Sequence, residues 1–126
     1  MSDFKLAMAL LIIIIIFSCT YIRMLDKTAD SFITKIESLE KLVESEKWTD
    51  AEKQLNNIQE KWSKTEKWIA SFVDHEEIDS IKITLAKLSQ YVHRKEATDF
   101  MAESAVLKLL IKHIPGKEKP KLQNLL

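Results

Sequence analysis

The sequence predicts an all-α protein, in which an N-terminal transmembrane helix runs into a small antiparallel bundle of about four helices. Residues 6–22 form an uncharged apolar run (LAMALLIIIIIFSCTYI), near the lower limit of length for a helix that spans a bilayer. The 126 residues include one glycine and two prolines, so the residues that punctuate loops are nearly absent. Apolar residues three and four apart continue along most of the remaining chain, as in amphipathic helices. Helices joined by very short connections account for all three observations.

The composition of the apolar run favours a membrane over water. Ten of its residues are Leu, Ile or Phe, and together they contribute about −3 to −6 kcal/mol to membrane insertion. A helix of this length covers about 26 Å, and Lys5 and Arg23 at its ends can extend their charged groups to the lipid headgroups. Tyr21 stands where an interfacial aromatic side chain is expected. We interpret residues 1–25 as a membrane anchor.

Two alternatives compete with a retained anchor. A cleaved secretory signal would end in a small-residue cleavage site, and no A-x-A pattern follows the run. A lipoprotein signal would place Cys19 at the cleavage site, but Phe17 is bulky where a small residue is usual. We therefore favour a single-pass protein of the cell membrane. Lys5 and the amino terminus favour a cytoplasmic N-terminus and an extracytoplasmic C-terminal domain.

Four apolar stripes predict four helices. Their predicted bounds are about 6–44, 48–72, 75–93 and 96–114. The first stripe starts at Ile22 with the alternating spacing of a coiled coil, and nothing separates it from the membrane run. Pro115 and Gly116 are predicted to end the last helix. The bundle then comprises residues 26–115, and residues 116–126 form a short tail.

The first stripe, in residues 22–43, can be buried in two ways. It can form the seam of a parallel homodimer, or it can pack against the later helices of the same chain. We favour packing within the chain, because the later helices also carry apolar faces that need a partner.

Charge is balanced overall but uneven along the chain. Residues 23–126 carry 18 Lys+Arg and 18 Asp+Glu (19 of each in the chain, less Lys5 and Asp3). No positive excess is available to neutralise phosphates, so a nucleic-acid partner is not expected. Residues 44–79 hold ten acids against five lysines, whereas residues 94–121 hold seven bases against four acids. We expect these two segments to pack side by side, where their charges are complementary.

The densest polar cluster lies at residues 74–79 (DHEEID). Asp74 and Glu77 have the spacing of a capping box, so the simplest role of the cluster is to begin a helix. A metal site needs ligands that converge from one face, and His75 has no second histidine nearby. The sequence has no P-loop, glycine-rich nucleotide motif or nucleophile elbow. We expect no metal, no cofactor, no catalytic residue and no enzymatic activity.

Trp68 and His113 complete the set of candidate binding residues. Trp48 and Trp62 lie on the apolar stripe of the second helix and are expected in the core. Trp68 lies off that stripe and is the better candidate for an exposed anchor, since tryptophan dominates many interfaces. His113 lies in the last turns of the fourth predicted helix.

Two segments resemble an uncharacterised family of short single-span membrane proteins from endospore-forming Firmicutes, a domain of unknown function. The segments are residues 62–88 (WSKTEKWIASFVDHEEIDSIKITLAKL) and 105–119 (AVLKLLIKHIPGKEK). The shared features are the spaced tryptophans, the D-H-x-E-I turn at Asp74, His75, Glu77 and Ile78, and the H-I-P helix end at His113. The resemblance implies an architecture and no activity. It also implies a partner, because genes of the family are expected beside those of another membrane-protein family. Gly116 departs from the glutamate expected there.

We therefore expect a membrane-tethered interaction or scaffold protein that binds another membrane protein. The residues expected to bind are Trp68, Asp74, His75, Glu77 and His113. The alternative is an extracytoplasmic ligand-sensing helical bundle, and a homodimer is the alternative partner. The scaffold predicts an exposed apolar patch that includes Trp68, whereas the sensor predicts a pocket of several hundred Å³ between helices.

Overall fold

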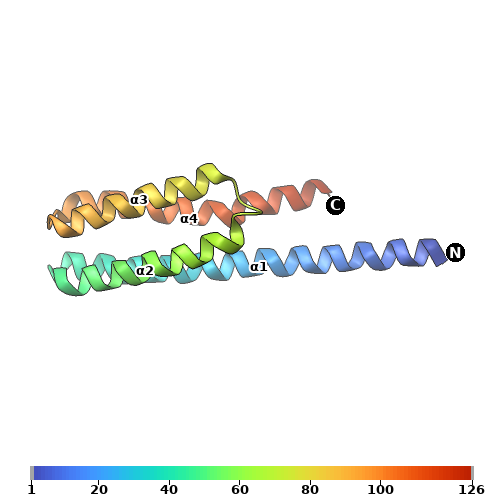
Figure 1. Cartoon of the computed structure of the whole chain (residues 1–126), viewed down its shortest axis with the longest axis horizontal. Coiled ribbons are helices and arrows are strands. Elements are labelled where there is room, and N and C mark those ends of the chain that lie inside the picture. Colours follow the sequence, from blue (N-terminus) through green and yellow to red (C-terminus); the bar gives the residue numbers. More distant parts are fainter. Residues whose placement is uncertain (1, 126) are drawn as a thin grey trace.

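The computed structural model contains four helices, and it describes the backbone of residues 2–125 and the side chains of residues 2–115. The helices are α1 (Ser2–Glu44), α2 (Trp48–Ile69), α3 (His75–His93) and α4 (Ala97–Leu125). Residues 2–125 contain no strand. Helix α1 is the longest and projects beyond the bundle at its N-terminal end (Figure 1). The predicted all-α fold, in which a long apolar helix runs into a small bundle, is confirmed.

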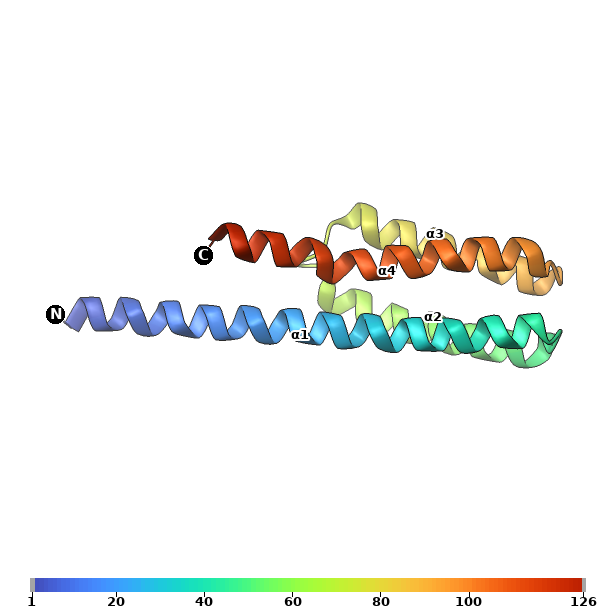
Figure 2. The same cartoon turned by 180° about the vertical axis from the view of Figure 1, so that it is seen from behind.

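The four helices occupy the four corners of the bundle. Helix α1 packs against α2 and α4, and α3 packs against the same two helices. Helices α1 and α4 therefore lie side by side although they are far apart in the sequence (Figure 2). Helices α2 and α4 lie across a diagonal. The predicted pairing of residues 44–79 with residues 94–121 is found only in part. Helix α2 lies across the diagonal from α4, whereas α3, whose first turn carries Glu76 and Glu77, packs against α4.

The core consists of apolar stripes from all four helices, which form one cluster. The stripe of α1 is buried inside its own chain. Its buried members are Leu25, Ala29, Phe32, Ile36, Leu39 and Val43. This arrangement agrees with the favoured interpretation, in which residues 22–43 pack against later helices of the same chain. Because Leu25 is already in the core, the bundle begins at the end of the apolar run.

The connections between α1 and α2 and between α3 and α4 are short turns without glycine, at the end of the bundle away from the apolar run. Glu46 follows α1 with φ 56°, and Lys95 follows α3 with φ 57°. In the first turn the N–H of Lys47 donates to the carbonyl of Leu42 at 2.9 Å, and the N–H of Glu46 donates to the carbonyl of Val43 at 3.0 Å. This pair of bonds is the Schellman motif, which usually places glycine at the left-handed position.

The connection between α2 and α3 corrects the predicted end of the second helix at residue 72. Helix α2 ends at Ile69, and the chain then turns before α3 begins at His75. The turn rotates Phe72 out of the apolar stripe, so its side chain is 52% exposed. Val73, which is 6% exposed, fills the core position instead.

The outer ends of α1 and α4 also differ from the predicted bounds. Helix α1 begins at Ser2 rather than near residue 6. Helix α4 continues through Pro115 and Gly116 to Leu125, which corrects the predicted helix end and the tail over residues 116–126. A proline removes one backbone N–H and disfavours a helix interior, but the neighbouring residues keep their own donors and can continue the helix.

Candidate functional site

The N-terminal part of α1, which contains the apolar run, projects beyond the bundle and is apolar on all its faces. Large side chains from Phe4 to Phe17 are exposed, and Leu6, Ile13 and Ile16 are each at least 60% exposed. A helix that is apolar all round is buried in a larger core or in a membrane. By length and composition, α1 is long and apolar enough to cross a membrane. It is the one such helix in the described part of the chain.

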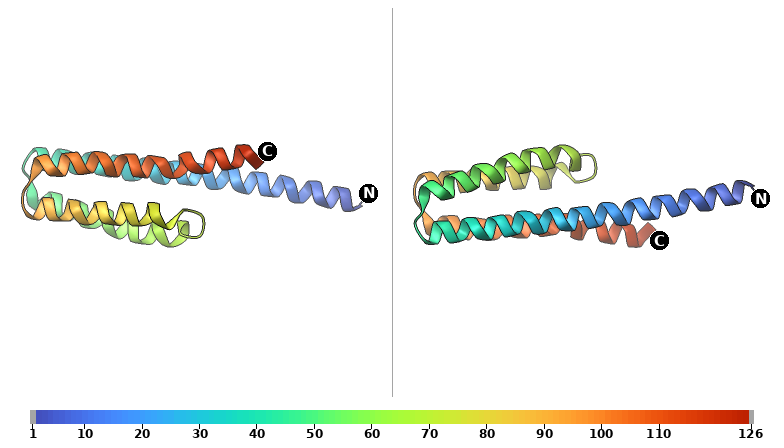
Figure 3. Two further views of the ribbon diagram at one scale, coloured as in Figure 1. Left: turned by 90° about the horizontal axis from the view of Figure 1, so that it is seen from above. Right: turned by 90° about the horizontal axis from the view of Figure 1, so that it is seen from below.

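An aromatic group marks the end of the bundle that adjoins this run. Both views in Figure 3 show the α2–α3 turn at one end of the bundle, and α1 continues past this level toward its N-terminus. The Tyr21 ring lies 4.9 Å from the Phe72 ring. It also lies 6.4 Å from the Trp68 ring in an edge-on arrangement. Together with the exposed Met24, these residues form what we call the basal patch: Tyr21, Met24, Trp68 and Phe72.

The register of the two helices explains the basal patch. Helix α2 runs antiparallel to α1 from the turn at residues 45–47, so its last residues return to the level of Tyr21. Trp68 is 38% exposed and Met24 is 51% exposed. Aromatic side chains that are exposed and adjoin one another are typical of a binding surface rather than of scattered surface residues.

The predicted polar residues lie at the same end of the bundle. Asp74 precedes α3, and His75 and Glu77 lie in its first turn. The cap role predicted for the Asp74 side chain is wrong, because its carboxylate makes no capping hydrogen bond. Its backbone carbonyl instead accepts from the N–H groups of Glu77 and Ile78, at 3.1 and 3.3 Å.

His113 lies on α4, near the same end. The next residue, Ile114, faces a narrow core space of about 10 Å³ that Leu25 and Ile69 also line. The side chain of His113 itself is exposed, as is that of His75. Among the described residues, no group of three His, Cys, Asp or Glu side chains could hold a metal ion. The structure thus gathers the predicted residues at one end without joining them in a single constellation.

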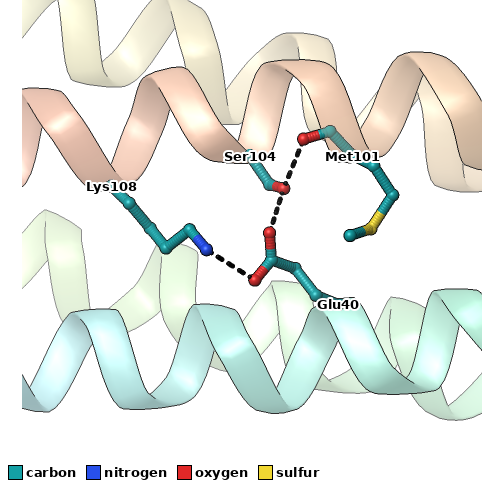
Figure 4. Close-up of polar contacts among 4 residues, drawn as sticks. All are labelled: Glu40, Met101, Ser104 and Lys108. Atoms are coloured by element: carbon teal, nitrogen blue, oxygen red, sulfur yellow. Dashed lines mark hydrogen bonds and ion pairs between the residues drawn. The ribbon is translucent and has the colours of Figure 1, made fainter.

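A buried polar network ties α1 to α4 about one turn before the end of α1 at Glu44 (Figure 4). Lys108 donates to one oxygen of the Glu40 carboxylate at 2.9 Å, and the hydroxyl of Ser104 donates to the other at 2.6 Å. The Ser104 hydroxyl also lies 3.0 Å from the carbonyl of Met101, but one hydroxyl proton serves one acceptor at a time. Glu40 is 8% exposed and Ser104 is fully buried.

Two open clefts flank α2. The larger, of about 360 Å³, lies between α1 and α2 and is lined by Lys27, Thr28, Ser31, Phe32, Lys35, Lys61, Lys64 and Thr65. The smaller, of about 250 Å³, lies between α2 and α3 beside Trp62 and Glu66. The buried Trp62 Nε1 and Glu66 Oε2 have no hydrogen-bond partner in the described part of the chain.

Sequence reasoning missed both the buried network and the lysine-lined cleft. Ser104 occupies a core position of the fourth stripe, and a serine there signals a buried polar partner. The cleft has a weaker signal. Lys27 and Lys35 share one face of α1, and Lys61 lies on α2, so only the antiparallel pairing of the two helices brings them together.

The model of one protein family, described as a domain of unknown function (DUF4363), matches residues 19–125. The chain belongs to the DUF4363 family. The predicted membership of an uncharacterised family is therefore confirmed. No curated protein and no solved structure matches the chain. The DUF4363 match begins inside the apolar run and includes the whole basal patch, the buried network and both clefts.

Proposed function

We propose that this DUF4363 protein is a non-enzymatic, membrane-tethered interaction subunit that binds another membrane protein. The basal patch carries the proposal. Trp68 and Phe72 are exposed on the bundle and pack around Tyr21, at the level where the apolar run of α1 ends. A partner that spans the same membrane would meet this surface as soon as it leaves the bilayer.

The apolar run supplies the tether in this proposal. Its exposed side chains need an apolar environment, and a single pass of the cell membrane provides one. Lys5 and the amino terminus favour the cytoplasmic side, which would place the bundle outside the cytoplasm. Asp74, His75, Glu77 and His113 surround the basal end and would form the polar rim of the interface.

A crosslinked co-purification from native membranes, with a tag at the C-terminus, tests the proposal. We expect one dominant membrane protein at near-equal amount, and we expect Trp68→Ala and Phe72→Ala to abolish its recovery. Ile83→Ala is the matched control, because Ile83 is 58% exposed on α3 and lies outside the basal patch. If only self-crosslinks are recovered, the partner is a second copy of this chain and not another membrane protein. Equal recovery from all variants would refute the role of the basal patch.

A second candidate is an extracytoplasmic ligand-sensing bundle, and the cleft between α1 and α2 favours it. The cleft volume of about 360 Å³ falls in the range of small-molecule sites. The space inside the core, about 10 Å³ beside Leu25 and Ile114, holds no ligand of that size. A ligand would therefore bind on the side of the bundle and not in its centre.

A further inference from the structure

The cleft between α1 and α2 is lined by an unusual concentration of positive charge. Four of its residues are lysines: Lys27, Lys35, Lys61 and Lys64. No Asp or Glu lines it. The chain as a whole has no net charge, so this excess of four positive charges is local.

These lysines have no acidic partner in the described part of the chain. The ion pairs found there engage Lys82, Lys87 and Lys108, and none of these lines the cleft. The four lysines of the cleft therefore share one lining without a carboxylate among them.

Lys35 on α1 and Lys61 on α2 line the cleft from its two sides. Hydrogen bonding to the Lys61 side chain, partial burial and the Lys61 charge lower the pKa of Lys35 below its ordinary value of 10.5. Two lysines that line one cleft from neighbouring helices favour a bound anion, because an anion between them converts repulsion into two attractions.

The remaining lining supplies hydroxyl donors and an apolar floor. Thr28 and Ser31 on α1 and Thr65 on α2 add hydroxyl groups. The Thr65 hydroxyl donates to the carbonyl of Lys61 at 2.8 Å, which leaves its oxygen as an acceptor, so Thr28 and Ser31 are the better donors to an anion. Phe32, which packs edge-on against Trp62 at 5.7 Å, offers an apolar surface to the carbon portion of a ligand.

We propose that the cleft between α1 and α2 binds a phosphate group, held by Lys27, Lys35, Lys61 and Lys64. Phosphate matches this lining better than a carboxylate does, because it carries up to two negative charges and more acceptor oxygens. Lysine binds phosphate as a point charge. The inference gives the ligand-sensing candidate a ligand class and does not depend on a membrane-protein partner.

The position of the cleft admits two sources for the phosphate. Lys27 lies five residues after Ile22, about 8 Å along the helix from the end of the apolar run, and Lys35 lies about 20 Å from it. A lipid headgroup at the membrane surface can reach Lys27. A soluble phosphate ester can reach all four lysines.

Calorimetric titration of the full chain with inorganic phosphate, in zwitterionic micelles at constant ionic strength, tests the proposal. We expect saturable binding, and we expect Lys35→Gln/Lys61→Gln to weaken it about tenfold or more, as loss of charge-assisted hydrogen bonds does. Lys53→Gln/Lys67→Gln is the matched control. It removes the same charge from exposed positions of α2 outside the cleft and should leave binding unchanged.

A second arm separates the two sources. The wild type, these two double variants and a third, Lys27→Gln/Lys64→Gln, are melted in zwitterionic nanodiscs with and without an anionic phospholipid. We expect the anionic lipid to raise the melting temperature of the wild type. Loss of this stabilisation in Lys35→Gln/Lys61→Gln or in Lys27→Gln/Lys64→Gln, but not in the control, supports a headgroup phosphate. That conclusion holds even if calorimetry detects no binding of inorganic phosphate. Equal weakening in the control variant, or no response in either arm, would overturn the proposal. Neither result bears on the co-purification, so the two proposals fail separately.

Discussion

The Glu40 carboxylate lies 2.9 Å from the Lys108 ammonium, and this ion pair joins α1 to α4 inside the bundle. Ser104 contacts the second carboxylate oxygen, so both oxygens of Glu40 have a partner. A buried carboxylate without partners would be strongly unfavourable. Sliding α4 along α1 by one turn would remove both contacts, so the network favours a single register of the two helices.

Glu40→Ala should lower the free energy of unfolding by about 1.5–3 kcal/mol, the range for hydrogen bonds to charged groups. The higher values reported for fully buried pairs do not apply, because the Lys108 side chain is 28% exposed and can turn to water. Chemical denaturation of the full chain in detergent micelles measures the change. Glu37→Ala, an exposed glutamate on the same helix, should stay within about 0.5 kcal/mol. Equal effects of both variants would mean that the network does not stabilise the bundle.

Glu46→Gly and Lys95→Gly should each raise the stability by about 1 kcal/mol. Both residues adopt positive φ, a conformation that costs a non-glycine residue about 1–2 kcal/mol, and glycine's greater freedom in the unfolded chain offsets part of that gain. Melting temperatures of the two variants give the measurement. Glu44→Gly, at the last residue of α1, should instead lose stability. A loss in all three variants would contradict the argument from φ.

Asp74→Ala should change the stability by less than about 0.5 kcal/mol. A true side-chain cap would cost about 0.5–2 kcal/mol when truncated, but the Asp74 carboxylate makes no capping bond. Ile78→Ala, which truncates a core side chain in the same turn, should cost about 2–5 kcal/mol and shows that the assay can detect a loss. A drop for Asp74→Ala within the range of a true cap would restore its side chain to that role.

The sequence predicted the helices because each carries one apolar stripe at helical spacing, and the stripe survives in the structure almost residue for residue. Phe72 shows where that logic stops. Spacing alone placed it on the stripe of α2, but the chain leaves the helix after Ile69 and Val73 takes the core position. When the turn that ends a helix contains no glycine or proline, the spacing of the apolar residues does not show where the helix ends.

Some features of the candidate site could likewise be predicted from residue spacing, and others could not. Trp68 was predicted as exposed because it stands off the stripe, and its exposure follows from that geometry alone. The Glu40–Lys108 pair and the cleft between Lys35 and Lys61 depend on which helices become neighbours. Composition suggested that residues 44–79 and 94–121 would pair, but the bundle places α2, which lies within the first segment, diagonally across from α4. To predict contacts between distant segments one must know which helices are neighbours, and the spacing of residues along the sequence does not give that.

Trp68 should be quenched by brominated lipids in a reconstituted bilayer, whereas Trp48 should not. Trp68 contacts Tyr21 at the end of the apolar run. Trp48 begins α2 at the opposite end of the bundle, about 30 Å away along the helix. Single-tryptophan variants of the full chain, with the other two tryptophans replaced by phenylalanine, allow the comparison. Equal quenching of both would place the bundle flat on the membrane and not upright on it.

The stability difference between the wild type and Lys61→Gln should depend on pH. Lys61 lowers the pKa of Lys35 in the folded chain, mainly by hydrogen bonding and also by its charge. Because the folded pKa lies below the unfolded value of 10.5, the unfolded chain binds more protons between these two values, and stability rises with pH across that window. At a pH below that window, where the interaction that lowers the pKa of Lys35 is unfavourable, Lys61→Gln should be the more stable protein.

That advantage should shrink as the pH rises toward 10.5, since the folded wild type releases the Lys35 proton before the unfolded chain does. Melting the two proteins side by side across the alkaline range cancels the titration of all the other lysines. Lys53→Gln, which removes a charge outside the cleft, should keep a constant difference from the wild type. A constant difference for Lys61→Gln as well would show that Lys35 and Lys61 do not interact in solution, and it would remove the electrostatic basis for an anion between them.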